Sequence, residues 1–105
     1  MILSHEDGLN LINNFKHKYN YEIELLCLNS DFMNIHEIHK ELKKLEQLQK
    51  DFPENIVLKE SEFHSLDKPY YECSVFCDKK ESDKFELVLS DRDITIDLYH
   101  DYTLV

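Results

Sequence analysis

The stretch NIHEIHKELKKLEQLQKDFP, residues 34–53, is the clearest structural signal in the chain. Asn34 and Glu37 have the spacing of a capping box, in which the two side chains satisfy each other's backbone N–H groups. Apolar residues then recur at intervals of three and four, the period of an amphipathic helix. Because a residue that precedes proline is pushed out of the α region, Pro53 ends the element. The pattern predicts a helix from Asn34 to about Asp51 with one buried face.

The sequence before this helix predicts a shorter helix and a strand. Ser4 can cap a helix that runs to about Lys18, although Gly8 weakens its first turn. From Tyr21 to Leu28 the apolar residues alternate with others, which is the period of a strand.

The part of the chain after Pro53 is expected to be rich in strands. Four strands are predicted from their β-branched and aromatic residues, at 56–63, 70–77, 84–90 and 94–99. Short polar breaks favour antiparallel connections between them. We therefore predict an α+β fold with two helices packed on one face of a mostly antiparallel four- to five-stranded sheet, in the order α-β-α-β-β-β-β. Because no linker rich in Pro, Gly or Ser divides the chain, residues 1–105 are expected to form one domain.

Composition limits the class of protein. Of 105 residues, 42% are hydrophobic and 32% are charged, which is enough apolar material for a core inside a strongly solvated surface. The sequence has no apolar run of about eighteen residues and no export signal at its start, so no membrane partner is expected. Three cysteines are too few and odd in number for a disulfide framework, which favours a cytoplasmic location.

Acidic residues are concentrated outside the central helix. The formal net charge is -10, from 22 acidic residues against 12 Lys and Arg. Residues 37–51 hold four residues of each sign, whereas the part after Pro53 has 13 acidic against 6 basic residues. This excess argues against direct contact with nucleic acid, and it favours a basic protein as partner or simple solubility.

Alternation in the strands assigns an inner and an outer face to the sheet. The outer face combines carboxylates, which pair with Arg and Lys across an interface, with tyrosines, which offer contact area. The alternative is that these residues only make the solvent-exposed face of the sheet polar and keep the protein soluble. The inner positions of the last two strands are Phe85, Leu87, Leu89, Ile94, Ile96 and Leu98. The candidate partner-binding residues are Glu22, Glu24, Tyr70, Glu72, Glu86, Asp97 and Tyr99.

No pattern in the chain indicates a catalytic site, a cofactor or a metal centre. Cys73 and Cys77 would lie about 13 Å apart along one strand, too far to share an ion. Together with Cys27 they are expected to be buried, unreactive thiols. His36 and His39 lack the spacing of a zincin motif. A single glycine leaves no loop to hold a phosphate.

These features favour an acidic binding protein that neutralises a basic partner by occlusion. An immunity protein directed against a bacterial toxin such as a nuclease has this character. Two other binding roles stay open, namely mimicry of nucleic acid against a DNA-binding enzyme and a structural or adaptor subunit. A small enzyme would use His64 or His100 with a carboxylate. The terminus Thr103-Leu104-Val105 also fits the loose pattern of a PDZ ligand, and the oligomeric state stays open.

Overall fold

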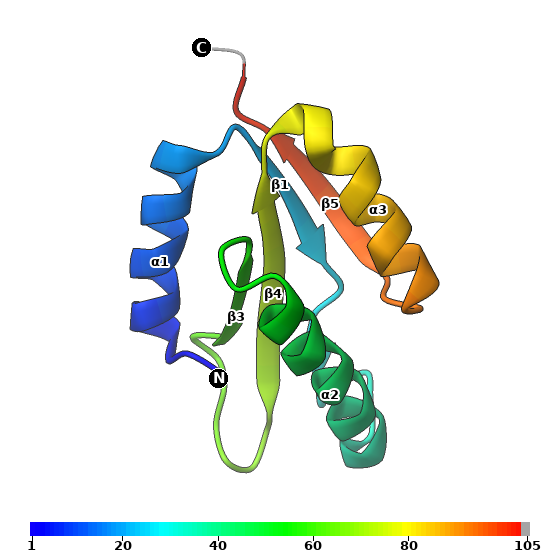
Figure 1. Cartoon of the computed structure of the whole chain (residues 1–105). Helices are drawn as coiled ribbons and strands as arrows, with labels where there is room; N and C mark the ends of the chain where they lie inside the picture. The colour runs from blue at the N-terminus through cyan, green and yellow to red at the C-terminus, as the bar shows by residue number, and fades with distance from the viewer. Residues whose placement is uncertain (104–105) are drawn as a thin grey trace.

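The computed structural model describes residues 1–103, which form an α+β fold with three α-helices and a five-stranded sheet (Figure 1). Leu104 and Val105 lie outside the described residues, and the PDZ-type terminus with them. The elements are α1 (His5–Lys18), β1 (Tyr21–Leu25), β2 (Leu28–Asn29), α2 (Ile35–Asp51), β3 (Ile56–Glu60), β4 (Tyr70–Cys77), a 3-10 helix (Lys79–Glu81), α3 (Ser82–Asp91) and β5 (Ile96–Asp101).

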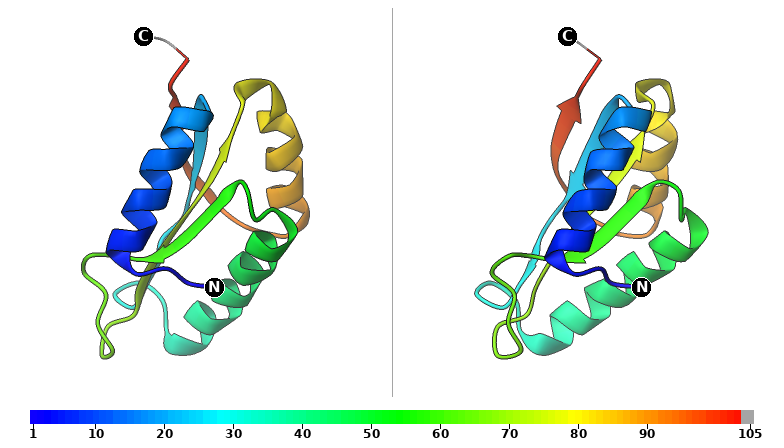
Figure 2. Two further views of the ribbon diagram at one scale, coloured as in Figure 1. Left: turned by 60° about the vertical axis from the view of Figure 1, so that its left-hand side comes forward. Right: turned by 90° about the vertical axis from the view of Figure 1, so that its left-hand side faces the viewer.

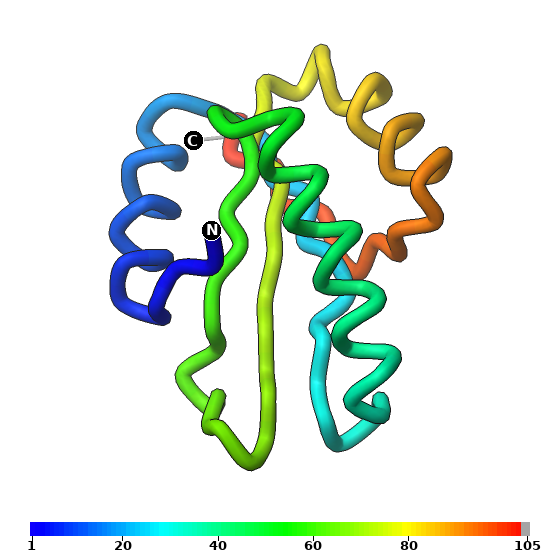
Figure 3. The backbone as a smooth tube through the Cα atoms, turned by 60° about the horizontal axis from the view of Figure 1, so that its bottom comes forward, coloured from blue at the N-terminus to red at the C-terminus, as the bar shows by residue number. Residues whose placement is uncertain are grey.

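The central strand of the sheet is β4, and the named strands pair antiparallel. β3 runs along one edge of β4, with Ile56 opposite Val75 (Figure 3). β1 and then β2 follow the other edge, where Ile23 also lies opposite Val75 and Leu28 lies opposite Tyr71. β5 pairs with the far edge of β1. The predicted strand from residue 21 to 28 is therefore divided into two short strands.

Helices cover both faces of the sheet, which corrects the expectation that two helices share one face. α1 packs on one face through a cluster of Phe15, Val57 and Phe76. α2 and α3 pack on the other face, over a larger core that includes Leu58 and Val75 (Figure 2). Both sides of β3 and β4 carry apolar residues, so a helix is needed on each side to remove them from water.

Residues 84–90, which were expected to form a strand, belong to α3. Phe85 and Leu89 are buried, whereas Leu87 between them is 64% exposed. Apolar spacing of this kind over a short segment fits a helix as well as a strand, and the helix packs on the sheet instead of joining it. The order of elements is therefore α-β-β-α-β-β-α-β, which corrects the predicted order.

A bulge reverses the alternation within β5. Leu25 lies opposite Ile96, but the next residue toward the start of β1, Glu24, lies opposite Leu98. Asp97 is thus an extra residue in β5, and every side chain after it changes face. Leu98 is 52% exposed on the face of Glu24 instead of lying inside.

Capping residues place the first two helices where the sequence predicted them. The Asp7 backbone N–H donates to Ser4 Oγ at 3.2 Å. Asn34 and Glu37 form the capping box, and α2 ends at Asp51. Among residues 1–103, no helix has both the length and the apolar character needed to cross a membrane.

Candidate functional site: an acidic groove beside the first helix

A groove of about 170 Å³ lies on the face of the sheet that α1 partly covers. Glu22 and Glu24 come from β1, Glu72 and Ser74 come from β4, and Ile12 comes from α1. Their side chains meet because alternate residues of a strand share a face and Glu24 lies opposite Ser74. We call this feature the acidic groove. Its lining is Ile12, Glu22, Glu24, Leu25, Cys27, Glu72, Cys73 and Ser74.

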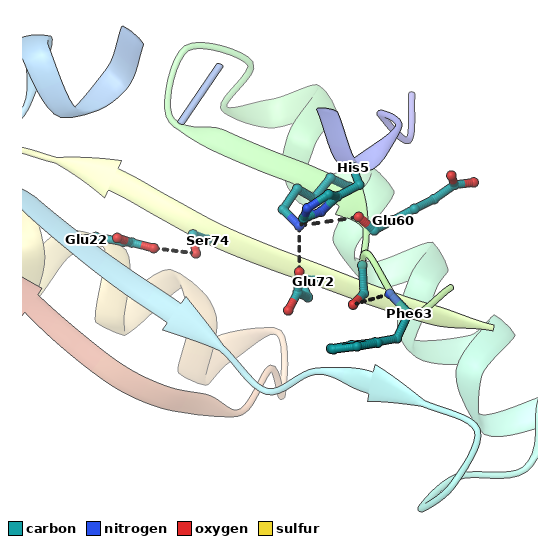
Figure 4. A network of polar contacts seen from close by, with 8 residues as sticks. His5, Glu22, Glu60, Phe63, Glu72 and Ser74 are labelled. Atoms are coloured by element: carbon teal, nitrogen blue, oxygen red, sulfur yellow. Dashed lines mark hydrogen bonds and ion pairs between the residues drawn. The ribbon is translucent and has the colours of Figure 1, made fainter. Parts of the chain in front are cut away.

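Glu22 is the buried carboxylate of the acidic groove, with only 7% of its surface exposed. Ser74 Oγ donates to Glu22 Oε2 at 2.7 Å (Figure 4), and the Tyr102 hydroxyl donates to Glu22 Oε1. Burial and the neighbouring Glu22 raise the pKa of Tyr102, so this hydroxyl keeps its proton. Among residues 1–103, no Lys, Arg or His nitrogen lies within 4.0 Å of the Glu22 carboxylate. In this part of the chain, the side-chain hydrogen bonds to Glu22 come from two hydroxyl groups.

Glu24 lies at the edge of the acidic groove and contacts a histidine of β5. Glu24 Oε2 and His100 Nε2 are 2.9 Å apart. The ring of His100 lies almost parallel to that of Tyr102, with centroids 6.3 Å apart. Ligand atoms of Glu22, Glu24 and His100 all lie within 4.8 Å of one another. These three side chains are the described residues that could hold a metal ion.

Glu72 lines the acidic groove from β4 and contacts a buried lysine. Lys59 is 4% exposed beneath the start of α1, and its Nζ contacts Glu72 Oε1. Lys59 Nζ also lies 3.0 Å from His5 Nδ1, so three elements meet at this ammonium group (Figure 4). Glu72 is thus fixed in position, with 38% of its side chain exposed.

Four of the residues predicted to bind a partner share this face. Glu22, Glu24 and Glu72 line the acidic groove, and Tyr70 follows the same alternation along β4. Asp97 is exposed at the bulge of β5 and is not part of the groove lining.

The other two predicted residues lie on the opposite side of the sheet. The Tyr99 hydroxyl donates to Glu86 Oε1 of α3 at 2.7 Å. That hydrogen bond, together with burial, raises the pKa of Tyr99 to about 12. Glu86 and Tyr99 therefore form a pair of their own, because Glu86 belongs to a helix and the bulge moves Tyr99 to the α3 side.

The thiols follow the prediction at two of three positions. Burial raises the pKa of Cys73 to about 12 and that of Cys77 to about 11. Cys27 is partly exposed in the acidic groove instead of buried, because it lies between β1 and β2 where the strand pairing is interrupted. Burial and the charge of Glu72 raise its pKa as well, which keeps this thiol protonated at neutral pH.

His64 and His100, the histidines that a small enzyme would use with a carboxylate, each lie near a glutamate but lie far from each other. His64 Nε2 is 3.6 Å from Glu60 Oε2, and His100 Nε2 is 2.9 Å from Glu24 Oε2. His64 accepts the N–H of Tyr70 at 3.0 Å, at the start of β4. His100 lies opposite Glu22, which in turn lies opposite Phe76 near the end of β4. Six residues of strand separate these two places, or about 20 Å.

Three residues of the site had no clear signal in the sequence. Ser74 and Tyr102 become relevant because they donate to Glu22, and Lys59 because its side chain is buried against Glu72. The position of Lys59 directly after the apolar run 56–58, in a predicted strand, was the one sequence feature that pointed to its burial.

Comparison with known proteins gave no relative. A scan against protein-family models, a search of curated proteins and a search of solved structures each found no match to this chain.

Proposed function

We propose that this protein binds a basic protein through the acidic groove and neutralises it by occlusion, as an immunity protein does with a toxin such as a nuclease. The observation that carries the proposal is that Glu24 and Glu72 line one groove, with Tyr70 next to Glu72 on the same face of β4, in a chain of net charge -10. A cationic cleft that ordinarily receives an anionic substrate is a complementary surface for these carboxylates.

The side chains at the rim are suited to contact with a partner. Glu24 and Glu72 have 33% and 38% of their side chains exposed, so each carboxylate reaches solvent. Both are held by a neighbour, His100 or Lys59, so less side-chain entropy is lost on binding. Tyr70 adds aromatic contact area, and the excess negative charge accelerates encounter with a basic protein.

Glu22 supports this surface from below and is not a contact residue in the proposal. Its burial prevents a partner from reaching it, and its two hydroxyl donors maintain the floor of the groove. Glu86 and Tyr99 are likewise left out, because they lie on the α3 side.

The test is affinity capture from the native source, at low and then raised salt, with a pair of matched charge-reversal variants. The double variant Glu24→Lys, Asp97→Lys alters the groove side. The control Glu81→Lys, Asp91→Lys changes the net charge equally at exposed positions of the α3 side. We expect wild type and control to retain one basic protein that is released as salt rises, and the groove variant to lose it.

The captured protein is then assayed for its own activity with and without this chain. Neutralisation requires that a stoichiometric amount of wild type suppresses the activity and that the groove variant does not. The acidic groove is not the binding surface if the groove variant and the control variant retain the basic protein equally. The same conclusion follows if the two variants suppress its activity to the same extent, because they differ in the position of the changed charges and not in net charge.

A further inference from the structure

The antiparallel pairing of β1 and β5 brings two carboxylates and one imidazole to the same place. Glu22 lies directly opposite His100, and Glu24 follows two residues along β1 on the same face. The ligand atoms of the three side chains lie within 4.8 Å of one another. Glu24 Oε2 and His100 Nε2 lie 2.9 Å apart.

We propose that Glu22, Glu24 and His100 bind a divalent transition-metal ion of the zinc type. One imidazole nitrogen with two carboxylate oxygens is a mixed donor set that such ions accept, whereas Mg²⁺ and Ca²⁺ favour oxygen alone. Tetrahedral zinc holds its ligand atoms about 3.3 Å apart. Because the two strands already fix the backbone positions, side-chain rotation is enough to bring the three ligand atoms from their present separations, 2.9 Å for Glu24 Oε2 and His100 Nε2 and at most 4.8 Å for the others, to this spacing.

The surroundings of Glu22 distinguish this cluster from ordinary surface acids. A carboxylate that is 7% exposed, with no cationic nitrogen within 4.0 Å among residues 1–103, bears a desolvation cost that hydroxyl donors offset only in part. A bound cation would supply the missing opposite charge. Ser74 and Tyr102 already orient the carboxylate, as outer-shell hydrogen bonds do around metal ligands.

The site also has room for the rest of a coordination sphere. Glu22 and Glu24 line the acidic groove, whose volume of about 170 Å³ is open to solvent. Three protein ligands with a position left for water match an accessible zinc site better than a closed structural one. The thiol of Cys27 lines the same groove and is the main competing ligand for a soft metal.

This inference does not depend on the proposed partner, because metal binding is measured on the isolated protein. Metal-free protein is titrated with Zn²⁺ by calorimetry and with Co²⁺ by visible absorption. We expect one ion per chain and a higher thermal midpoint with Zn²⁺. The variants His100→Gln and Glu24→Gln alter partly exposed side chains, and each should weaken binding at least about tenfold.

Matched controls separate the site from adventitious binding. His64→Gln removes the other described histidine that lies near a glutamate, 3.6 Å from Glu60, and should bind as wild type does. The pair His36→Gln, His39→Gln removes the exposed histidines of α2, and Cys27→Ser removes the competing thiol. Both should also bind as wild type does.

Nitrogen NMR of the histidine rings provides a readout that does not depend on the stability of a variant. Zinc added to wild type should shift the His100 Nε2 resonance before those of the other five histidines. No binding, or binding that survives in His100→Gln and disappears in Cys27→Ser or the His36, His39 variant, would overturn the proposal.

Discussion

Gly8 of α1 lies directly against the side chain of Lys59 on β3. A Cβ atom added at Gly8 would lie 2.2 Å from Lys59 Cδ and 2.6 Å from Lys59 Cβ. Rotation of the lysine can move its Cδ but not its Cβ, so a larger residue at position 8 must displace α1 from the sheet. The glycine that weakens the first turn of α1 is therefore the residue that allows Lys59 to pass beneath it and reach Glu72.

Gly8→Ala should destabilise the protein despite the better helix propensity of alanine. The gain in propensity is about 1 kcal/mol, whereas overpacking costs about 1–3 kcal/mol and also disturbs the Lys59–Glu72 contact. Urea denaturation would measure the difference in unfolding free energy. Asn14→Ala, at an exposed position of the same helix, should be neutral or slightly stabilising. A Gly8→Ala protein more stable than wild type would contradict the close packing described here.

Phe76→Ala should remove most of the packing between α1 and the sheet. Phe76 is 0% exposed and its ring centroid lies 5.7 Å from that of Phe15. Truncation of a buried phenylalanine costs about 3–5 kcal/mol. Phe63→Ala is the control, because Phe63 is 70% exposed and its loss should change the unfolding free energy by no more than about 0.5 kcal/mol. If the two substitutions lowered the unfolding free energy equally in urea denaturation, the cluster of Phe15, Val57 and Phe76 beneath α1 would be contradicted.

The Tyr99–Glu86 hydrogen bond should make stability fall in strongly alkaline solution. The folded pKa of Tyr99 is about 12, above its ordinary value of about 10. The neutral hydroxyl is favoured in the folded protein, so its stabilisation is complete below pH 10 and is lost as the pH rises through 12. Glu86→Gln should lower the pKa of Tyr99. The absorbance of tyrosinate is measured against pH for wild type and for Glu86→Gln, and the curve of the matching Tyr99→Phe protein is subtracted from each to isolate Tyr99. If the pKa of Tyr99 is the same in both, the hydrogen bond is excluded.

The Lys79–Asp101 ion pair should stabilise the folded protein, and this stabilisation should be lost only in strongly acidic solution. Lys79 Nζ lies 2.7 Å from Asp101 Oδ2, and its hydrogen bond lowers the pKa of Asp101 to about 2. A depressed folded pKa means that the stabilisation is present above about pH 4, the unfolded value, and is lost as the pH falls through 2. Lys79→Met should raise the pKa of Asp101 in a carbon NMR titration, although the Thr103 N–H still donates to it. Lys80→Met, at the next position, should leave it unchanged.

Local signals predicted the helices whose ends are marked by side chains. Ser4, Asn34 and Pro53 define α1 and α2 because capping and proline geometry act within a few residues. The same reasoning failed for α3, where Phe85, Leu87 and Leu89 suggested a strand. Ten residues are too few for the two periods to be distinguished, and packing of Phe85 and Leu89 against the sheet decides for the helix.

The candidate site was predictable only where one strand contains it. Glu22 and Glu24 share a face of β1 by alternation alone, as do Tyr70 and Glu72 on β4. His100 joins them because β5 pairs with β1, and the bulge at Asp97 decides which of its side chains face Glu24. Neither the pairing partner nor the bulge has a marker in the local sequence.

The sequence by itself determined the acidic charge, the class of fold and the ends of the first two helices, because composition and capping depend on near neighbours in the chain. Tertiary structure alone decided that helices cover both faces, that Lys59 is buried beside Gly8, and that Glu22, Glu24 and His100 converge. The physical reason is that these features depend on strand register. A shift of one residue moves every side chain of a strand to the other face, and only the packing of the whole core selects between the two.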